Sequence, residues 1–380
     1  MNTLQSNKDV SHAFYLQHRN LFSPSMTAPP AESFPHVIQF ELTEGCSYGA
    51  CTFCDMPRGG YRVKTLPEYK KHVDSVWDAI RGKNKSTIRG IERLFIGGEN
   101  ALSVDTSLLQ DAATYTIASF EKNTGRLPRR ITVYGNTRDI LSKKNRFKSA
   151  SSELRFLNCG GVCGNCSRDK FGSKIGLGYI YWGVESGDTE TLRYVGKGYT
   201  HDDILKAGNA IDDSRIGQSV TIIPGLGGAK FASSHLEKTI SVLNEIMPAF
   251  VTFIGINPAP HTRYAQRMAQ EIAKGANRPL TPKEVAEQTA KMLEGLKFGT
   301  TVGCFGSDIQ KFGYNPVPFG SIQIEYYSTE EKRNVLLGMR NKIMAEDFEI
   351  SPTPNFTSEL ITPEVDDKPR RSIFPMFSGR

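Results

Sequence analysis

The chain has 380 residues, of which 38% are hydrophobic and 23% are charged, and its formal net charge is +7. This composition predicts a packed soluble core, and no apolar run is long enough to cross a membrane. The first 35 residues contain no apolar segment of the kind found in a secretion signal. The charge is mild for this length, so it permits an anionic substrate or a nucleic acid without indicating either.

Six apolar runs predict β-strands in chain order. They are His36–Leu42, Glu92–Ile96, Arg130–Tyr134, Tyr179–Val184, Ser219–Ile223 and Phe250–Ile256. Near-continuous apolarity is typical of parallel strands that are covered on both faces. Amphipathic segments alternate with the runs, and the Thr65–Glu68 and Thr281–Glu284 pairs have the spacing of helix capping boxes. The alternation predicts an α/β fold whose parallel sheet curls into a partial (β/α)6 TIM-like barrel.

The predicted core spans residues 36–260, preceded by an N-terminal arm over residues 1–35. A C-terminal extension over residues 261–350 is expected to close the barrel with two further β-type runs, 300–305 and 321–327. The tail, residues 351–380, is rich in Pro, Ser and Arg and is predicted to be flexible.

Polar or glycine-rich residues follow every predicted strand at its carboxyl end. Active sites of such folds lie at that end of the sheet. The residues expected to meet there are Cys46, Cys51 and Cys54, then Gly97, Gly98 and Glu99, then Asn136, Glu185, Ser186, Gly225 and Gly227, and finally the segment 257–261.

The first of these groups is a C-x4-C-x2-C triplet, formed by Cys46, Cys51 and Cys54. Three thiolates this close together can hold three corners of a [4Fe–4S] cube, which leaves the fourth iron open to another ligand. A zinc ion is the alternative, with its fourth ligand supplied by His36 or Asp55. Clustered thiols in a large chain also favour metal binding in a reducing cytoplasm over a disulfide framework.

The chain resembles the radical S-adenosylmethionine (radical SAM) enzymes over about residues 36–260. The resemblance rests on the triplet, with Phe53 before its last cysteine, and on three strand-end motifs. These motifs are Gly97-Gly98-Glu99, Gly183-Val-Glu185-Ser186-Gly187 and Ile223-Pro-Gly-Leu-Gly227. The usual family triplet is C-x3-C-x2-C, so the first gap here contains one extra residue.

The resemblance implies that SAM binds the open iron of the cluster. Its reductive cleavage would yield a 5′-deoxyadenosyl radical that takes a hydrogen atom from a substrate. Gly97, Gly98 and Glu99 would contact the methionine part of SAM. Phe53, Gly225 and Gly227 would lie near its adenine, and Glu185 and Ser186 would bind the ribose or carboxylate, with Asn136 beside them. The alternative for each residue is an ordinary turn, cap or core position.

A second triplet, Cys159, Cys163 and Cys166, lies in a predicted insertion over residues 158–175. The insertion falls in a helix-to-strand loop, and such loops lie at the end of the sheet opposite the active site. An auxiliary iron–sulfur cluster, a zinc site completed by Asp169, a histidine or Cys304, and no metal at all are the three interpretations. If the second site is remote, Cys163→Ala should leave some SAM cleavage.

Cys304 stands alone in the predicted strand 300–305. A free cysteine there is most simply a buried core residue. It could instead return a hydrogen atom to a substrate radical or complete the second metal site.

The family resemblance also implies a flavodoxin or ferredoxin as the electron donor. A small-molecule substrate is expected, because no recognisable RNA-binding or peptide-binding domain is present, and neither a cobalamin-binding domain nor a cysteine-rich extension is found. Two rival functions remain open. One is a non-catalytic zinc or iron–sulfur module that docks nucleic acid, and the other is a cluster enzyme that transfers the aminocarboxypropyl group of SAM.

Overall fold

The computed structural model describes residues 18–23, 26, 36–54, 60–81, 85–143, 147–158, 176–254, 256, 261–305 and 322–324. The second cysteine triplet, Asp55, Asp169, the tail 351–380 and most of the N-terminal arm lie outside these ranges, so their predicted roles stay predictions. Within the described ranges, no helix combines the length and the apolar character needed to cross a bilayer.

The strands are β1 (Val37–Glu41), β2 (Thr43–Glu44), β3 (Arg62–Val63), β4 (Arg93–Gly97), β5 (Ile131–Gly135), β6 (Leu177–Glu185), β7 (Gly217–Ile222), β8 (Phe250–Ile254), β9 (Thr300–Phe305) and β10 (Ile322–Ile324). The helices are α2 (Leu66–Arg81), α3 (Lys85–Gly90), α4 (Thr106–Thr124), α5 (Thr137–Ser142), α6 (Ala150–Asn158), α7 (Thr189–Tyr194), α8 (His201–Asp213), α9 (Ala232–Ile246), α10 (Arg263–Ala273) and α11 (Pro282–Glu294). Short 3₁₀ turns are η1 (Arg19–Leu21), η2 (Ala101–Ser103) and η3 (Ala229–Phe231).

The main sheet is an open, partial TIM-like barrel. Its strand order is β1-β4-β5-β6-β7-β8-β9-β10, and all neighbours from β1 to β9 are parallel. All six predicted strands are confirmed in chain order. The predicted run 300–305 is also a strand, and it continues the parallel sheet beside β8 because α10 and α11 supply the crossover that a parallel strand requires. Strand β10 closes the described order as an antiparallel edge.

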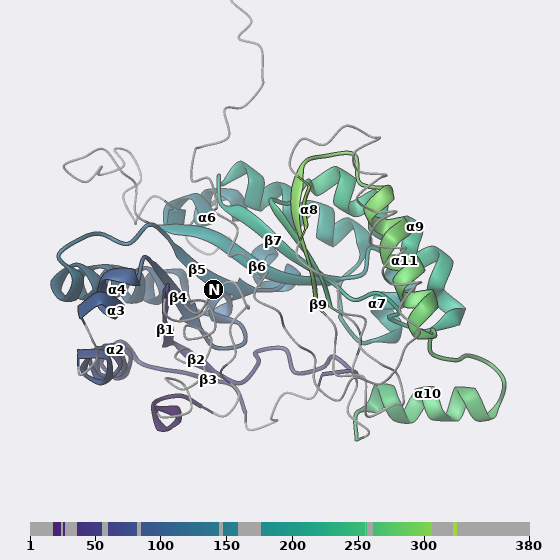
Figure 1. Ribbon diagram of the computed structural model, residues 1–380, viewed down its shortest axis with the longest axis horizontal. Helices are drawn as coiled ribbons and strands as arrows, with labels where there is room; N and C mark the ends of the chain where they lie inside the picture. The colour runs from purple at the N-terminus through teal and green to yellow at the C-terminus, as the bar shows by residue number, and fades with distance from the viewer. Residues whose placement is uncertain are drawn as a thin grey trace, which may run out of the picture.

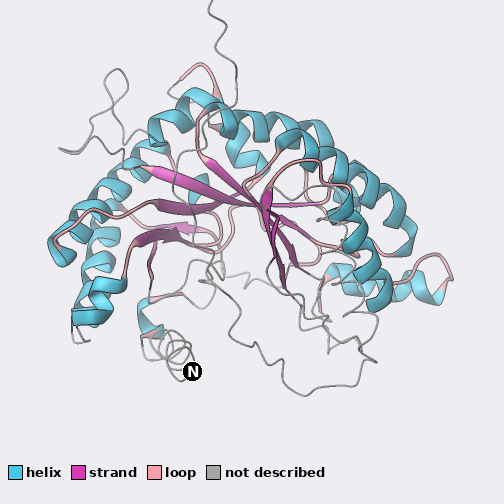
Figure 2. Cartoon of the chain, turned by 45° about the horizontal axis from the view of Figure 1, so that its top comes forward, coloured by secondary structure: helices cyan, strands magenta, loops and turns pink. Residues whose placement is uncertain are grey.

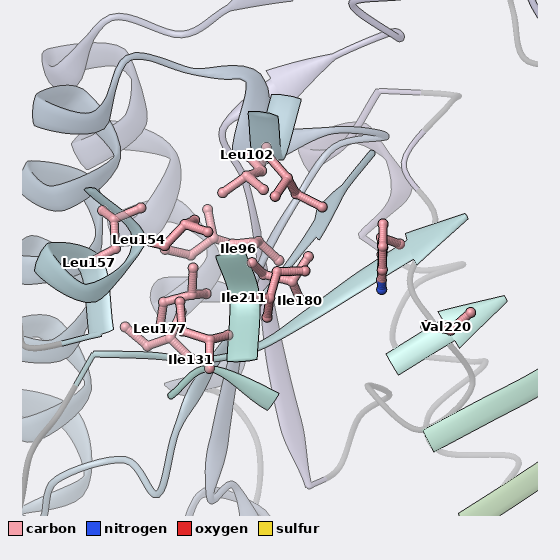
Figure 3. Close-up of a cluster of buried hydrophobic side chains, with 14 of the residues drawn as sticks. Ile96, Leu102, Ile131, Leu154, Leu157, Leu177, Ile180, Ile211 and Val220 are labelled. Carbon is pink, nitrogen blue, oxygen red and sulfur yellow. The ribbon is translucent and has the colours of Figure 1, made fainter. Parts of the chain in front are cut away.

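The helices cover the outer face of the curved sheet. Figure 1 shows α8, α9 and α11 stacked outside the strands, and Figure 2 shows the helices as an arc around them. Part of the core between the two layers is aliphatic: Figure 3 shows Ile96, Ile131 and Ile180 from the sheet meeting side chains of the covering helices. The helix side chains in this cluster include Leu154, Leu157 and Ile211. Burial of such side chains stabilises each by about 1.5–3 kcal/mol.

Alternate residues of the strands face away from this core, toward the inside of the barrel. In β6, Ile180 and Trp182 are buried on the helix-covered face. Tyr179 and Tyr181, which alternate with them along the strand, are partly exposed. The ring of Tyr181 contacts that of Tyr134 on β5 in an edge-on arrangement, with centroids 6.2 Å apart. The barrel interior is therefore lined by amphipathic rings, and its carboxyl end carries the candidate site.

The two predicted capping boxes are present. At the start of α2, the Thr65 backbone N–H and hydroxyl both donate to the Glu68 carboxylate, at 2.7 and 2.8 Å. At the start of α11, the Thr281 N–H donates to Glu284 at 2.8 Å and the Glu284 N–H donates to the Thr281 hydroxyl. These bonds satisfy N–H groups that a helix start otherwise leaves without partners.

Two buried histidines should make the apo-protein sensitive to acid. Burial lowers the pKa of both His72 and His235 to about 4. His72 accepts the Glu41 backbone N–H through Nε2 at 2.9 Å, a bond that the protonated ring cannot make. An unfolded histidine titrates near 6.5, so each folded ring binds its proton later as the pH falls. The resulting stability is complete above about pH 6.5 and is lost toward pH 4.

We expect acidification from pH 7 to pH 5 to cost about 2 kcal/mol of unfolding free energy per histidine. Urea unfolding of the apo-protein at both pH values measures this loss. His72→Gln keeps an acceptor near the Glu41 N–H but cannot titrate, so its loss on acidification should be smaller than that of the wild type. An equal loss in both proteins would show that His72 does not contribute.

Candidate active site

A cavity of about 250 Å³ opens at the carboxyl ends of β4 to β7, beside the cysteine loop. Of the predicted site residues, it brings together Cys46, Cys51, Phe53, Cys54, Glu99, Asn136 and Glu185. Its lining also includes Gly183, the first residue of the second strand-end motif. Further lining residues lie outside these motifs: Tyr48, Asn100, Tyr134, Gly135, Arg138, Lys197, Tyr199 and Thr221. The strand-end rule thus located the site, and further side chains complete it.

The cysteine loop is closed at its base by the short β2–β3 hairpin, in which Thr43 pairs with Val63. At the neck, a side chain at Gly45 would collide with the Gly60 carbonyl oxygen, since an ideal Cβ lies 2.4 Å from it. Arg62 and Lys64 both bind Glu44, at 2.9 and 2.6 Å, and the Arg62 hydrogen bond is the main cause that lowers the pKa of Glu44 to about 2. The ionised hairpin therefore holds both ends of the loop together.

The connector between α7 and α8 forms hydrogen bonds with the other side of the cysteine loop. The Thr52 N–H donates to the Val195 carbonyl at 2.8 Å, and the Tyr48 hydroxyl donates to the Gly196 carbonyl at 2.7 Å. Close approach requires glycine at position 198, which has a φ of 68° and whose ideal Cβ would lie 2.4 Å from the Tyr48 hydroxyl. The loop is therefore fixed by backbone contacts rather than by the cysteines alone.

Lys197, at the centre of this connector, forms a buried ion pair with Glu185. Its Nζ lies 3.0 Å from the Glu185 Oε1, and the two side chains are only 10% and 11% exposed. The ammonium also lies 5.8 Å from the ring centres of Phe53 and Tyr199. Burial opposes the positive charge, but Glu185, Tyr199 and Cys51 together outweigh it and raise the pKa of Lys197 well above its usual value. A charged lysine therefore faces the cavity.

The same ammonium acts on the nearest thiol. Burial raises the pKa of Cys51, and the positive charge of Lys197 opposes that rise. The lysine was missed because it follows a helix rather than a strand. The sequence carries one signal for it, the Gly196-Lys197-Gly198 pattern, in which two glycines permit close approach of the backbone.

Glu185 has an unusual backbone conformation for its residue type. Its φ is 63°, in the left-handed region, and the pairing of β6 with β7 shifts register between Gly183 and Glu185. A left-handed residue with a side chain costs roughly 1–2 kcal/mol, and bulges of this kind re-aim side chains beside active sites. The buried Glu185 Oε2 has no hydrogen-bond partner among the described residues. Strain and an unsatisfied acceptor thus coincide at one cavity residue.

The opposite wall is built on a polar cluster around Asn100. Its side-chain amide donates to the Ser47 hydroxyl at 2.8 Å and to the Asp139 carboxylate. Its oxygen, Oδ1, is buried and has no partner among the described residues. Asn136 caps α5 by accepting the Asp139 N–H at 3.1 Å, and Arg138 stacks over the Tyr48 ring at 4.8 Å. This wall therefore presents a second unsatisfied acceptor and an exposed guanidinium.

Five of the predicted SAM contacts do not line the cavity. Gly97 and Gly98 lie beside it, where the Gly98 N–H approaches the Met26 sulfur at 3.3 Å. The other three are held away from it by burial or by backbone hydrogen bonds. Ser186 is fully buried, the Gly225 N–H donates to Gln288, and the Gly227 N–H donates to the Tyr264 hydroxyl. Their predicted contacts with SAM stay predictions.

Gly98 permits a close backbone approach. Its φ is 102°, and an ideal Cβ would lie 2.0 Å from the Thr43 hydroxyl and 2.2 Å from the Thr43 carbonyl oxygen. Gly98→Ala should therefore combine backbone strain with a clash and destabilise the protein by about 3 kcal/mol or more. Thermal melting of the apo-protein measures the effect.

Gly125 supplies the matched control for this substitution. It has a φ of 72°, but nothing lies within 4 Å of its ideal Cβ. Gly125→Ala should cost only the strain, roughly 1 kcal/mol. Equal melting temperatures for the two variants would refute the clash at Gly98.

Cys304 lies on β9, where it pairs with Phe253 of β8. Its predicted roles, as a core cysteine, a hydrogen donor or a ligand of the second metal site, stay predictions. Cys46, Cys51 and Cys54 are free thiols. Within the described ranges, no three His, Cys, Asp or Glu side chains converge closely enough to hold a single metal ion.

Comparisons with known proteins give structural matches only. No family model matches the chain, and neither does any curated protein. TsrM from Kitasatospora setae, a radical SAM methyltransferase, is 15% identical with a TM-score of 0.43 over 62% of this chain and 40% of that chain. The cobalamin-dependent SAM radical enzyme OxsB is 16% identical, with a TM-score of 0.45 over 68% and 41%. Methylornithine synthase (PylB) is 13% identical, with a TM-score of 0.40 over 78% and 73%.

The chain spans about two fifths of the length of TsrM and OxsB. At these identities and TM-scores, the likeness carries no argument about activity. The strand order of the chain itself defines the partial barrel.

Proposed function

We propose that this protein is a radical SAM enzyme. Cys46, Cys51 and Cys54 would bind a [4Fe–4S] cluster, and the cavity beside them would bind SAM. The observation that carries the proposal is the meeting of all three thiols with the Lys197–Glu185 pair in one cavity at the carboxyl end of a partial barrel. Three thiolates suit a cube with one iron left for a ligand.

The donor and acceptor groups of the cavity fit SAM. SAM carries an ammonium and two ribose hydroxyls as donors, and the cavity offers the unsatisfied oxygens Glu185 Oε2 and Asn100 Oδ1. SAM also carries a carboxylate, and Lys197 and Arg138 supply positive charge. Buried polar groups without partners are costly, so these oxygens support a ligand that brings donors.

Aromatic side chains complete the fit. Phe53, Tyr134 and Tyr199 line the cavity, and aromatic walls suit an adenine ring. A reduced cluster held by Cys46, Cys51 and Cys54 would supply the electron that cleaves SAM, and so give a radical able to take a hydrogen atom from substrate. The task of this chain is to orient SAM, exclude water and separate the radical from other side chains.

The proposal assigns roles to the predicted residues in two groups. Phe53, Glu99, Asn136 and Glu185 would contact SAM directly because they line the cavity. Gly97, Gly98, Gly225 and Gly227 would act through backbone shape, and Ser186 would act through the packing behind Glu185. A small-molecule substrate, a flavodoxin or ferredoxin donor and a reducing cytoplasmic setting complete the proposal, together with a second metal site at Cys159, Cys163 and Cys166.

Anaerobic reconstitution tests the proposal against its rivals. Iron and sulfide in about a 1:1 ratio, with 5′-deoxyadenosine and methionine formed from SAM under dithionite, would support it. Stoichiometric zinc without iron would contradict it and favour a structural module. Iron and sulfide with methylthioadenosine as the product would contradict radical formation and favour aminocarboxypropyl transfer.

A further inference from the structure

His235 on α9 is a fully buried histidine that lies behind the cavity rather than in it. Both of its ring nitrogens are engaged. Nδ1 lies 2.7 Å from the Ser186 hydroxyl oxygen, and Nε2 lies 3.1 Å from the Ile223 carbonyl oxygen. The ring therefore links the carboxyl end of β6, whose last residue is Glu185, to the carboxyl end of β7.

The partners of the ring fix its tautomer. A carbonyl oxygen can only accept, so Nε2 carries the hydrogen and Nδ1 accepts from the Ser186 hydroxyl. The Ser186 oxygen in turn accepts the Asp188 N–H at 3.0 Å. Burial lowers the pKa of His235 to about 4, so the ring is neutral near pH 7. The arrangement is therefore a directed chain of bonds that a phenyl ring of similar size cannot make.

These bonds hold both flanks of Glu185. Ser186 follows it directly in the chain, and the Ile223 N–H donates to the Glu185 carbonyl at 3.0 Å. Helix α9 also packs closely against Gly187, two residues after Glu185. An ideal Cβ at Gly187 would lie 2.2 Å from the Lys238 carbonyl oxygen on this helix. A left-handed glutamate persists only where its surroundings fix it. His235 bonds to Ser186, which follows Glu185 in the chain, and to Ile223, which bonds to the Glu185 backbone.

We propose that His235 is a positioning residue, which holds Glu185 in its left-handed conformation so that the carboxylate stays in the cavity beside Lys197. This inference rests on the proposed function, since Glu185 is there a contact of SAM. Loss of the ring bonds would let the β6 end relax toward an ordinary strand conformation. The carboxylate would then leave its place, and SAM would bind less tightly although the cluster ligands are untouched.

Two substitutions separate the bonds of the ring from its volume. His235→Phe fills the space without either hydrogen bond, and His235→Gln retains a donor near the Nε2 position. Equilibrium dialysis of SAM against reconstituted protein, at matched iron content, gives the dissociation constant. We expect at least a tenfold weaker constant for His235→Phe and a smaller loss for His235→Gln. An unchanged constant in folded His235→Phe would overturn the inference.

A double-mutant cycle with Glu185→Gln distinguishes positioning from general stability. If His235 acts through Glu185, His235→Phe should weaken SAM binding less than twofold further in the Glu185→Gln background. Equal losses in both backgrounds would overturn the inference. His72→Phe is the control, because His72 bonds to Glu41 and should have the same effect, if any, in both backgrounds.

Two further outcomes of these experiments, an unfolded His235→Phe variant and wild-type protein without SAM affinity, also have a definite meaning. If His235→Phe does not fold, Ser186→Ala removes the shorter of the two Nδ1 contacts, the other being the Thr239 hydroxyl at 3.3 Å. It should show the same dependence on Glu185, and independence there would overturn the inference. Reconstituted wild-type protein that binds no SAM would overturn the proposed function itself. Wild-type protein that binds SAM, with His235→Phe unaffected, would overturn only the role of His235.

Discussion

Cys51→Ala should abolish SAM cleavage by the reconstituted protein, with a loss of at least 100-fold in 5′-deoxyadenosine formation. Cys51 lies between the other two thiols in the loop and lines the cavity beside Lys197. Without it, only two protein thiolates remain for a cube that needs three. The iron content should fall by about four atoms per chain, and mass spectrometry of the products should detect no 5′-deoxyadenosine above background.

Thr52→Val is the matched control in the same loop. The Thr52 hydroxyl has no hydrogen-bond partner among the described residues, and the backbone of Thr52 makes the contacts that fix the loop. Its iron content and cleavage should therefore stay near those of the wild type. Full cleavage by Cys51→Ala, or equal loss in both variants, would contradict the assignment of Cys51 as a cluster ligand.

Lys197→Met should have the largest effect on stability. The substitution leaves the Glu185 carboxylate buried without its cation, and breaking a buried ion pair from one side costs about 3–5 kcal/mol. Urea unfolding of the apo-protein measures this cost. SAM affinity should fall as well, because the cavity loses its buried positive charge.

Two further variants test whether the unpaired buried charge causes the stability loss of Lys197→Met. Lys197→Met combined with Glu185→Gln removes both charges, so most of the lost stability should return while SAM affinity stays low. Arg129→Met breaks the exposed pair with Glu92, whose side chains are 50% and 41% exposed, and should cost at most about 1 kcal/mol. If Lys197→Met were no more destabilising than Arg129→Met, the buried pair would not be an important element of the fold.

The sequence predicted the barrel well because each strand is an apolar run flanked by polar residues. The strand-end rule then placed Glu99, Asn136 and Glu185 near the cysteines, and all three line the cavity. The rule needs only the chain order of strands and their common direction. It does not depend on side-chain packing, which explains its success.

The same rule could not find Lys197 or Tyr199, because both come from a connector between two helices. Nor could the rule show that the Ser186 hydroxyl is buried and bonded to His235. The placement of such residues depends on local backbone conformation and on the packing of α9. Neither is visible as a pattern of residue types.

The most direct test of the account is whether SAM binds a cluster iron in this cavity. Electron–nuclear double resonance of the dithionite-reduced protein with SAM labelled with ¹⁵N at its amino group measures that contact. We expect a ¹⁵N coupling to the cluster spin, which should be absent in Cys51→Ala. A reduced cluster with SAM bound to the protein but no ¹⁵N coupling would contradict it.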